Sequence, residues 1–433
     1  MVILICLLTT LFTTNPRAQS ATPEINDLAD LSEAIDKIRL RTATPGIAIG
    51  LVQSGKPDWQ YYSGVSDLKT RRPFDKNSQF RFGSIAKMIV SLSLLKLAEE
   101  GKIDLDAKLT NIAPEIEFSN PWEPTHPIRI VHLLNHSTGW DSPHFTENRP
   151  LSTTPITIID ALTAHPHSRV SRWQPGSRVA YNNTAFLAAA YIVEKVTELS
   201  YETFVEQTFF SPLNMSHSGY YFSDTYRESA VSLYSNNQLQ PYQHLNNRAA
   251  GGLNSSIDDM LQLLKLLARE SPSSVASPAL LKAFRTPSGT KATNEGLTFT
   301  WGLGNQLFHA NGIPLYGHEG SLRGTNAILV YNPVYAFGYV IVGNSNSPAV
   351  SQIHARLSDY LTRNIHQPEV KVMRKLSTAD KELAGWYKNA APISDKFSFI
   401  QTIIPWKFNV GETTALIKPM IGAAPRLLIP NET

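Results

Sequence analysis

The sequence Phe82-Gly83-Ser84-Ile85-Ala86-Lys87 opens a mostly apolar stretch that continues to residue 100. The apolar residues fall on most sides of a helical wheel, which predicts a central buried helix over residues 84–100. Residues three positions apart share one face of a helix, so Ser84 and Lys87 point into the same space. The segment therefore sets a hydroxyl beside an amine at the start of the core helix.

A serine beside a lysine is one arrangement for nucleophilic catalysis, because the hydroxyl attacks a carbonyl carbon once a base removes its proton. Lys87 is such a base when it is neutral. Lowering its pKa from about 10.4 to about 7 costs roughly 4–5 kcal/mol, which burial must impose. The N–H of Ser84, at a helix N-terminus, also faces a developing oxyanion. The alternative is a capping serine followed by a surface lysine, because Ser-x-x-Lys occurs by chance in long chains.

A second segment, PGSRVAYNNT at residues 175–184, predicts a turn that leads into a helix. A tyrosine in such a turn, Tyr181, can share proton transfer with a serine, and the amide of Asn183 can bind a substrate carbonyl. The alternative is an interior tyrosine followed by an N-cap asparagine.

A third segment, YGHEGS at residues 316–321, predicts a strand beside a cleft. A glycine such as Gly320 allows a substrate backbone to approach the strand closely. The backbone N–H of Ser321 then supplies a second donor to an oxyanion.

Patterns along the rest of the chain indicate a sheet built from both chain ends. Strands are predicted at residues 46–53, 59–65, 327–331 and 337–342. Helices are predicted at residues 24–41, 156–164, 183–197, 201–209 and 349–363, and from a cap at Ser255 or Ser256 through residue 267. Strands near both ends with helices between them favour one sheet that carries a helical insertion.

The motif order Ser-x-x-Lys, Tyr-x-Asn and His-x-Gly resembles the serine penicillin-recognising superfamily, in its branch of class C β-lactamases, DD-carboxypeptidases and related esterases. The segments HLLNHSTG at 132–139, AGGL at 250–253 and Asn-Pro at 332–333 are similar to the same branch. The resemblance covers residues 45–365. It implies an α/β (α+β) class, β-lactamase/transpeptidase-like fold, with an antiparallel sheet flanked by helices and an all-helical subdomain.

The resemblance implies a catalytic role for three residues. Ser84 forms an acyl-enzyme, while Lys87 and Tyr181 move the proton of Ser84 and return it to the leaving group. Asn183 orients the acyl group. Water completes the hydrolysis, and neither a metal nor a cofactor is needed.

The resemblance assigns His318, Gly320 and Ser321 to substrate binding, with the Ser321 N–H in the oxyanion hole. Many relatives carry lysine at the position of His318. A histidine titrates near neutrality and anchors a carboxylate less firmly, so we expect β-lactam hydrolysis not to be the main activity. The remaining candidates are D-Ala-terminated cell-wall peptides, other D-amino-acid amides and short-chain esters.

The sequence also allows other interpretations. A non-catalytic member that binds peptidoglycan or acts as a sensor is the alternative, although it would not need a complete proton-transfer set. His132 and His136 are four residues apart, as in some zinc sites, but they lack the glutamate and a third ligand. The Gly302-Leu303-Gly304 segment lacks the third glycine of a dinucleotide-binding loop.

Composition and the N-terminus bound the remaining possibilities. The 433 residues are 42% hydrophobic and 17% charged, with a net charge of +3, which indicates a globular chain and argues against nucleic-acid binding. An apolar run at residues 2–12 predicts a signal peptide, a periplasmic or secreted protein, and no stable membrane span after cleavage. No Lys or Arg precedes that run, so an uncleaved buried helix is the alternative. The only cysteine, Cys6, lies in the leader, which excludes thiol chemistry from the mature chain.

We therefore expect three parts: a signal peptide over residues 1–20, a serine hydrolase domain over 21–366, and a small β-rich module over 367–433. Strand-like runs in the module lie at residues 383–387, 397–404, 414–418 and 426–429. The chain ends directly after the last run, so we expect an incomplete module. The sequence indicates neither the module's role nor the oligomeric state.

Overall fold

The computed structural model describes residues 25–141, 154–164, 166–269, 273–294 and 301–366, and the strands at 385–387, 406–410, 415–419 and 426–428. The expected signal peptide and the strand expected over residues 397–404 lie outside these residues. Within the described part of the chain, no helix is both long enough and apolar enough to cross a membrane.

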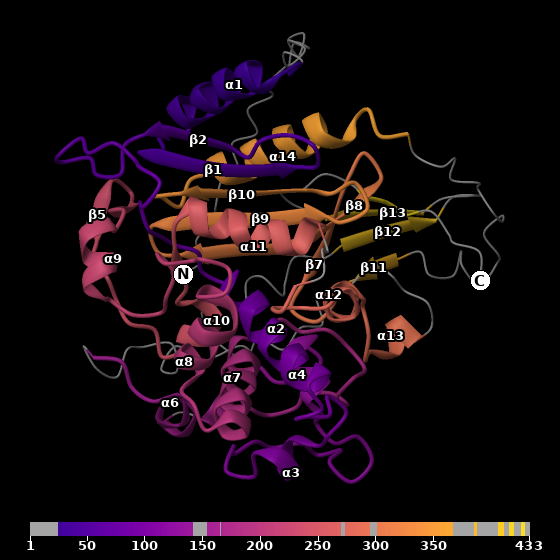
Figure 1. Ribbon diagram of the computed structural model, residues 1–433. Coiled ribbons are helices and arrows are strands. Elements are labelled where there is room, and N and C mark those ends of the chain that lie inside the picture. Colours follow the sequence, from indigo (N-terminus) through magenta and orange to yellow (C-terminus); the bar gives the residue numbers. More distant parts are fainter. Residues whose placement is uncertain are drawn as a thin grey trace, which may run out of the picture.

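Both chain ends contribute to one six-stranded antiparallel sheet, as the sequence predicts (Figure 1). Its strands, in spatial order, are β2 (Trp59–Gly64), β1 (Gly46–Gln53), β10 (Phe337–Gly343), β9 (Thr325–Asn332), β8 (Ile313–Leu322) and β7 (Gln306–Ala310). The pairing of β1 with β10 aligns Ile49 with Ile341 and joins the two chain ends at the middle of the sheet.

Strand β1 is buried on both faces, because only Gln53 among its residues reaches the surface in part. Alternate side chains, such as Ile49, pack under α1 (Leu28–Arg41) and α14 (Ala349–Thr362). The other face, with Val52, packs under α11 (Ile257–Arg269). A Cβ atom on Gly50 would lie 2.8 Å from Leu261 Cδ2, so α11 approaches the strand this closely only because the residue is glycine.

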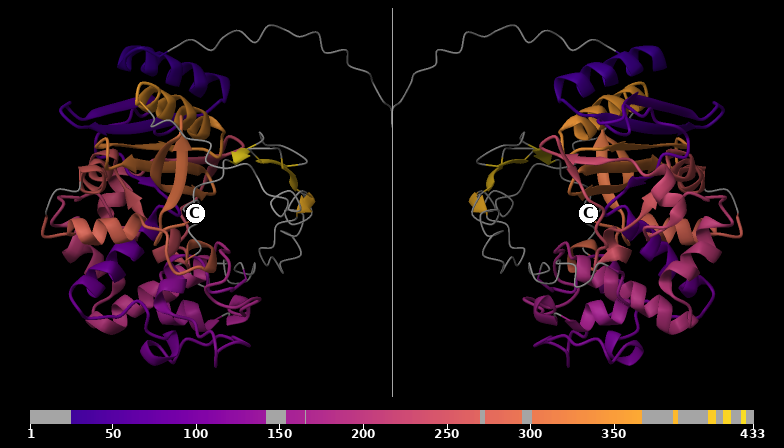
Figure 2. Two further views of the ribbon diagram at one scale, coloured as in Figure 1. Left: turned by 90° about the vertical axis from the view of Figure 1, so that its right-hand side faces the viewer. Right: turned by 90° about the vertical axis from the view of Figure 1, so that its left-hand side faces the viewer.

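The helices divide between the two faces of the sheet. The side views in Figure 2 place α1 and α14 together on one face and the helical region on the other. This region surrounds α2 (Ala86–Glu99), in which every residue from Ala86 to Leu95 is buried, so the predicted central helix is confirmed. The helices α7 (Asn183–Thr197), α10 (Arg248–Gly251) and α12 (Pro278–Arg285) pack around it.

The remaining elements of the main body are short. The helices are α3 (Leu109–Ile112), α4 (Ile130–Leu134), α6 (Ile158–Ala164), α8 (Tyr201–Val205), α9 (Asp224–Ser229) and α13 (Lys291–Asn294), with a 3₁₀ turn at Pro166–Ser168 and a π-helical turn at Glu206–Phe210. Two small ladders pair β3 (Phe80–Arg81) with β6 (Asn254–Ser255), and β4 (Leu233–Ser235) with β5 (Gln238–Gln240).

Four strands near the C-terminus form an antiparallel sheet of their own, in the order β11 (Gly385–Tyr387), β12 (Trp406–Val410), β13 (Ala415–Pro419) and β14 (Arg426–Leu428). Three of them overlap strands predicted from the sequence, whereas β12 was not predicted. The division into domains at residue 366 stays a prediction.

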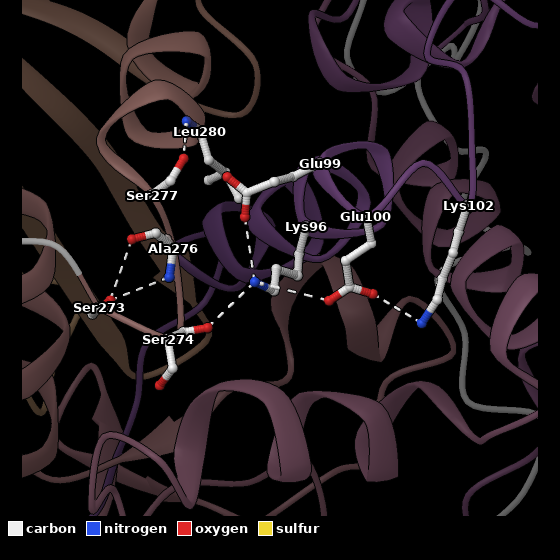
Figure 3. A network of polar contacts seen from close by, with 9 residues as sticks. All are labelled: Lys96, Glu99, Glu100, Lys102, Ser273, Ser274, Ala276, Ser277 and Leu280. Carbon is white, nitrogen blue, oxygen red and sulfur yellow. Dashed lines mark hydrogen bonds and ion pairs between the residues drawn. The ribbon is translucent and has the colours of Figure 1, made fainter.

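A polar network connects the C-terminal end of α2 to the segment before α12 (Figure 3). Lys96 Nζ donates to Ser274 O and to Glu99 Oε2, each at 3.3 Å. It also lies 3.8 Å from Glu100 Oε1. Ser277 Oγ caps α12 by accepting a backbone N–H of its first turn at 3.1 Å. Ion pairs this close to solvent add little stability, so the network mainly orients the helix end.

Several boundaries differ from the prediction, and β7 and α12 are among the elements that the sequence analysis did not predict. Helix α2 begins at Ala86 rather than at Ser84, and neither β7 nor α12 was expected. The β7–β8 hairpin closes through Asn311-Gly312, whose φ angles of 48° and 75° fit the two-residue turn that this pair favours. Helix α12 starts with a serine N-cap followed by proline, a recognised helix start. Both signals are present in the sequence.

Replacing Leu261 with alanine should lower the free energy of unfolding by about 2–5 kcal/mol, because a cavity opens between α11 and β1. Leu261 is 1% exposed. Urea unfolding followed by circular dichroism measures the loss. The control is Leu40→Ala on α1, where the side chain is 66% exposed, and the change should stay below about 0.5 kcal/mol. Equal losses in the two variants would contradict the described packing of α11.

Candidate active site

Ser84 lies in the turn that precedes α2. The Lys87 N–H donates to Ser84 O at 3.1 Å, an i to i+3 bond that directs both side chains to one side of the chain. As a result, Lys87 Nζ lies 3.0 Å from Ser84 Oγ. The structure therefore brings the predicted pair together, although through a tight turn rather than within the α-helix.

The side chain of Lys87 is completely buried. Its amine donates to Ala250 O at 2.8 Å, in the glycine-containing segment noted in the sequence. The rings of Tyr181 and Phe186 lie 4.9 and 5.7 Å from the amine. Burial lowers the pKa of Lys87 well below its ordinary value. Burial therefore favours the neutral amine that a general base requires.

Tyr181 lies just before α7, and its side chain lines the same cavity as Ser84. The ring centroids of His136, Trp301 and His318 lie 4.5, 5.5 and 6.0 Å from that of Tyr181. Although 37% of the Tyr181 surface is open to the cleft, burial of the hydroxyl raises its pKa. Tyr181 therefore retains its proton, which leaves Lys87 as the candidate base.

The two asparagines that follow Tyr181 have different roles. Asn182 is the N-cap of α7, because its Oδ1 accepts the Ala185 N–H at 2.8 Å and its Nδ2 donates to Asp141 O. Asn183 is the first residue of the helix and lines a cavity of about 230 Å³ together with Ser84. Capping therefore does not occupy the Asn183 amide, which leaves it available to a substrate.

Strand β8 passes directly against the Ser84 turn. A Cβ atom on Gly320 would lie 1.9 Å from Phe82 O, so only glycine permits this contact. A Cβ atom placed on Gly83 would lie 2.7 Å from Ser321 N, which brings the Ser321 backbone next to the same turn. The backbone N–H groups of Ser84 and Ser321 therefore lie close enough to form one oxyanion hole.

His318 differs from the sequence-based expectation, because it does not titrate near neutrality. Burial, and secondly the charge of Lys87, lower the pKa of His318 to about 3. Its Nδ1 donates to Glu319 O, and Nε2 has no hydrogen-bond partner among the described residues. A carbonyl only accepts, so Nδ1 carries the proton and Nε2 carries a lone pair. His318 is thus a buried neutral acceptor.

A cavity of about 780 Å³ opens beside Ser84 and Tyr181. Trp301 forms one wall, and the three substrate-binding residues predicted on β8 line it as well. The sequence analysis assigned no role to Glu319, which also lines the cavity. Its position in the sequence could have indicated such a role, because Glu319 is an ionisable residue at the variable position of the His-x-Gly motif.

The alternative sites weighed from the sequence have structural explanations. His132 Nδ1 accepts the Arg129 N–H at 3.1 Å in the cap of α4, and His136 Nδ1 accepts the Asn182 N–H at 3.1 Å. Among the described residues, no group of three His, Cys, Asp or Glu side chains is placed to hold a metal ion. The N–H of Gly304 donates to a carbonyl of α4, so its glycine-containing segment joins packed helices.

An antiparallel sheet with a helical region, and a serine–lysine pair at their junction, define the fold of β-lactamases and penicillin-binding proteins. Residues 31–362 match the family model described as Beta-lactamase, and the chain belongs to this family. The resemblance recognised from the three motifs is therefore confirmed.

Known relatives are distant. A β-lactamase of Yersinia enterocolitica is 22% identical over 373 residues, which cover 78% of this chain and 92% of the relative. The structure of the octameric penicillin-binding protein homologue from Pyrococcus abyssi matches with a TM-score of 0.68 at 24% identity. The match covers 93% of this chain and 90% of that chain. The D-amino acid amidase from Ochrobactrum anthropi SV3 has a TM-score of 0.62 at 21% identity, over 77% of this chain and 97% of its own. The structural likenesses confirm the predicted fold.

Replacing Lys87 with methionine should change how stability depends on pH. The folded pKa of Lys87 is depressed, whereas its ordinary value is 10.5, so between these values the unfolded wild type binds one more proton. Relative to the methionine variant, the free energy of unfolding of the wild type should fall by up to about 1.4 kcal/mol for each pH unit by which the pH is lowered within that window. Urea unfolding at about pH 9 and about pH 7 measures this slope.

Lys96→Met provides the matched control, because Lys96 lies on the same helix and its side chain is 16% exposed within a surface ion-pair network. This variant should show no such slope against the wild type. A stability difference between wild type and Lys87→Met that is independent of pH would contradict a buried neutral lysine.

Replacing Gly320 with alanine should displace β8 from the Ser84 turn and slow acylation of Ser84 by about 100-fold, the order expected when an oxyanion donor moves by about 1 Å. The rate of labelling by a fluorophosphonate measures this effect. Gly219→Ala is the control, since nothing lies within 4 Å of a Cβ atom built there. Equal labelling rates for Gly320→Ala and wild type would exclude the described contact of β8.

Proposed function

We propose that this chain is a serine hydrolase that cleaves an ester or amide through an acyl-enzyme on Ser84. The observation that carries the proposal is the 3.0 Å contact of Ser84 Oγ with the buried amine of Lys87, whose pKa is lowered by burial. A buried neutral lysine costs stability, and such a cost is typical of catalytic sites.

In the acylation step, neutral Lys87 takes the proton of Ser84 while Oγ bonds to the carbonyl carbon. The oxyanion that develops accepts the backbone N–H groups of Ser84 and Ser321. Tyr181 donates its proton to the leaving oxygen or nitrogen as the C–O or C–N bond breaks, and it regains a proton from Lys87. The Asn183 amide holds the acyl portion.

In the deacylation step, water attacks the ester formed on Ser84. Lys87 takes a proton from that water and returns it to Ser84 Oγ as the serine leaves, which regenerates the neutral amine. One water is consumed, and a carboxylic acid and an alcohol or amine are released. Side chains and backbone groups of this chain supply every proton transfer, so the proposal needs neither a metal nor a cofactor.

The proposed substrate is a small molecule or a peptide with an ester or amide bond. Relatives bear the names β-lactamase and D-amino acid amidase, which fits cleavage of amides beside unusual stereocentres. D-amino-acid amides, D-Ala-terminated cell-wall peptides and short-chain esters are the candidates. Neutral His318 provides no cation for a substrate carboxylate, which argues against β-lactams as the main substrate.

Export to the periplasm or the medium also belongs to the proposal. It rests on the apolar run at residues 2–12 and the small residues that follow it. Cleavage near residue 20 predicts a mature protein without cysteine, which intact-mass analysis of the secreted product would detect.

Exposure to a fluorophosphonate probe should add a single adduct to the wild type and none to Ser84→Ala. The physical reason is that only a serine beside a neutral base reacts rapidly with an electrophilic phosphorus. Intact mass spectrometry measures the adduct, and circular dichroism establishes that the variant is folded. Ser177→Ala, a serine whose hydroxyl bonds to Gln174 O, should label like the wild type. A folded wild type that forms no adduct would favour the peptidoglycan-binding or sensor function instead.

A further inference from the structure

Two cavities meet at Ser84 and divide the substrate between them. The larger one, of about 780 Å³, is lined by Tyr181, whereas the smaller one, of about 230 Å³, is lined by Asn183. In the proposed reaction Tyr181 protonates the leaving group and Asn183 holds the acyl portion. The larger cavity is therefore the leaving-group side, and its lining selects what the acyl group is attached to.

The leaving-group cavity carries a negative charge. Among the residues that line it, Glu319 has the only ionised side chain, since His318 is neutral. No hydrogen bond or ion pair engages the Glu319 carboxylate among the described residues. The side chain reaches solvent, yet surrounding protein atoms desolvate it enough to raise its pKa. Its charge also raises the pKa of Tyr181, so it acts on the group that protonates the leaving atom.

Of the side-chain amides that line this cavity, those of Asn346 and Asn326 are already engaged by the protein, whereas that of Gln306 is a neutral donor. Asn346 Nδ2 donates to Leu322 O at 2.7 Å and to Thr325 O at 3.0 Å. Asn326 Nδ2 donates to Ser347 O at 3.1 Å. An incoming carboxylate would have to displace these bonds, so these two amides do not form a ready anion site.

The hydroxyl groups are engaged as well. Ser321 Oγ donates to Asn326 Oδ1 at 2.9 Å, and Ser351 Oγ donates to Pro348 O at 2.9 Å. The first turn of α14 also borders the cavity, and its partial positive charge favours an anion. The full negative charge of Glu319 on β8 is larger than the partial positive charge at this end of α14.

One buried polar atom of a residue that lines the cavity lacks a donor. His318 is 2% exposed and lines the cavity, and its Nε2 lone pair has no partner among the described residues. A buried acceptor without a partner costs free energy until an N–H or O–H reaches it. His318 therefore adds no positive charge to the cavity, and the Glu319 carboxylate favours a substrate group that donates protons or carries positive charge.

We propose that the leaving group of the substrate is an alcohol or amine that bears a positive charge, and that Glu319 recognises this charge. The inference rests on the proposed hydrolase function. D-Ala-terminated peptides and β-lactams have a carboxylate on the leaving portion, which Glu319 repels. The substrate class is thus an ester or amide of a cationic alcohol or amine.

Three aryl acetates with one acyl group test the proposal: 3-(trimethylammonio)phenyl acetate, its neutral isostere 3-tert-butylphenyl acetate, and 3-carboxyphenyl acetate. Values of kcat/KM are measured at about pH 8 for wild type and Glu319→Gln. The ratio of cationic to neutral substrate should fall about tenfold in the variant, the size of one partly solvated ion pair. The ratio of anionic to neutral substrate should rise. Because each substrate ratio is compared between wild type and variant, the intrinsic reactivity of the esters cancels.

Glu228→Gln on α9 is the matched control, because Glu228 is exposed and does not line the cavity, and it should leave both ratios unchanged. Added salt should reduce the preference of the wild type for the cationic ester. Ser84-dependent turnover with the same charge ratios in wild type and Glu319→Gln would overturn the charge-recognition proposal alone. The proposal would also be overturned if the wild type had a higher kcat/KM for the anionic ester than for the cationic and neutral esters, whether or not Glu319→Gln removed that preference. Absence of Ser84-dependent turnover of all three esters would instead overturn the hydrolase function.

Discussion

The contact between Lys87 Nζ and Ser84 Oγ depends on burial of the amine, and that burial depends on most of the domain. Helix α2 carries the lysine into the core, α7 contributes Phe186, and α10 provides the Ala250 carbonyl that accepts from the amine. These elements come from separate parts of the chain. The base is therefore neutral only in the folded protein, where packing imposes the cost of removing a lysine from water.

The same burial sets the electrostatics of the whole site. Burial lowers the pKa of His136 and of His318, and a proton on Lys87 would lower both further, so protonation of one nitrogen base opposes protonation of its neighbours. A cluster of bases that resist protonation suits proton transfer from a serine. It also leaves Glu319 as the charge that a substrate meets in the larger cavity. Reactivity and charge preference thus arise from one arrangement, in which β8 lies against the Ser84 turn.

Membership of the Beta-lactamase family is compatible with a substrate that differs from those its relatives are named for. In the proposed function, the three motifs supply a nucleophile, a base and an oxyanion hole, and such groups act on any suitable carbonyl. Selection of a substrate depends on what lines the cavities beside them. Here the position where many relatives carry lysine holds a neutral histidine, and an acid follows it. Shared chemistry and a different charge preference can therefore coexist on one fold.

The sequence by itself determined the family, the sheet built from both chain ends, the buried helix and the motif residues, because each has a local or ordered pattern. Turn and cap signals for β7 and α12 were also present and were overlooked. Only the tertiary structure decided that His318 is neutral, because burial comes from segments distant in the chain. It likewise decided that Asn182 rather than Asn183 caps α7, and that Glu319 faces the cavity. Spacing along a chain predicts which side chains share a face, whereas desolvation depends on everything that packs around them.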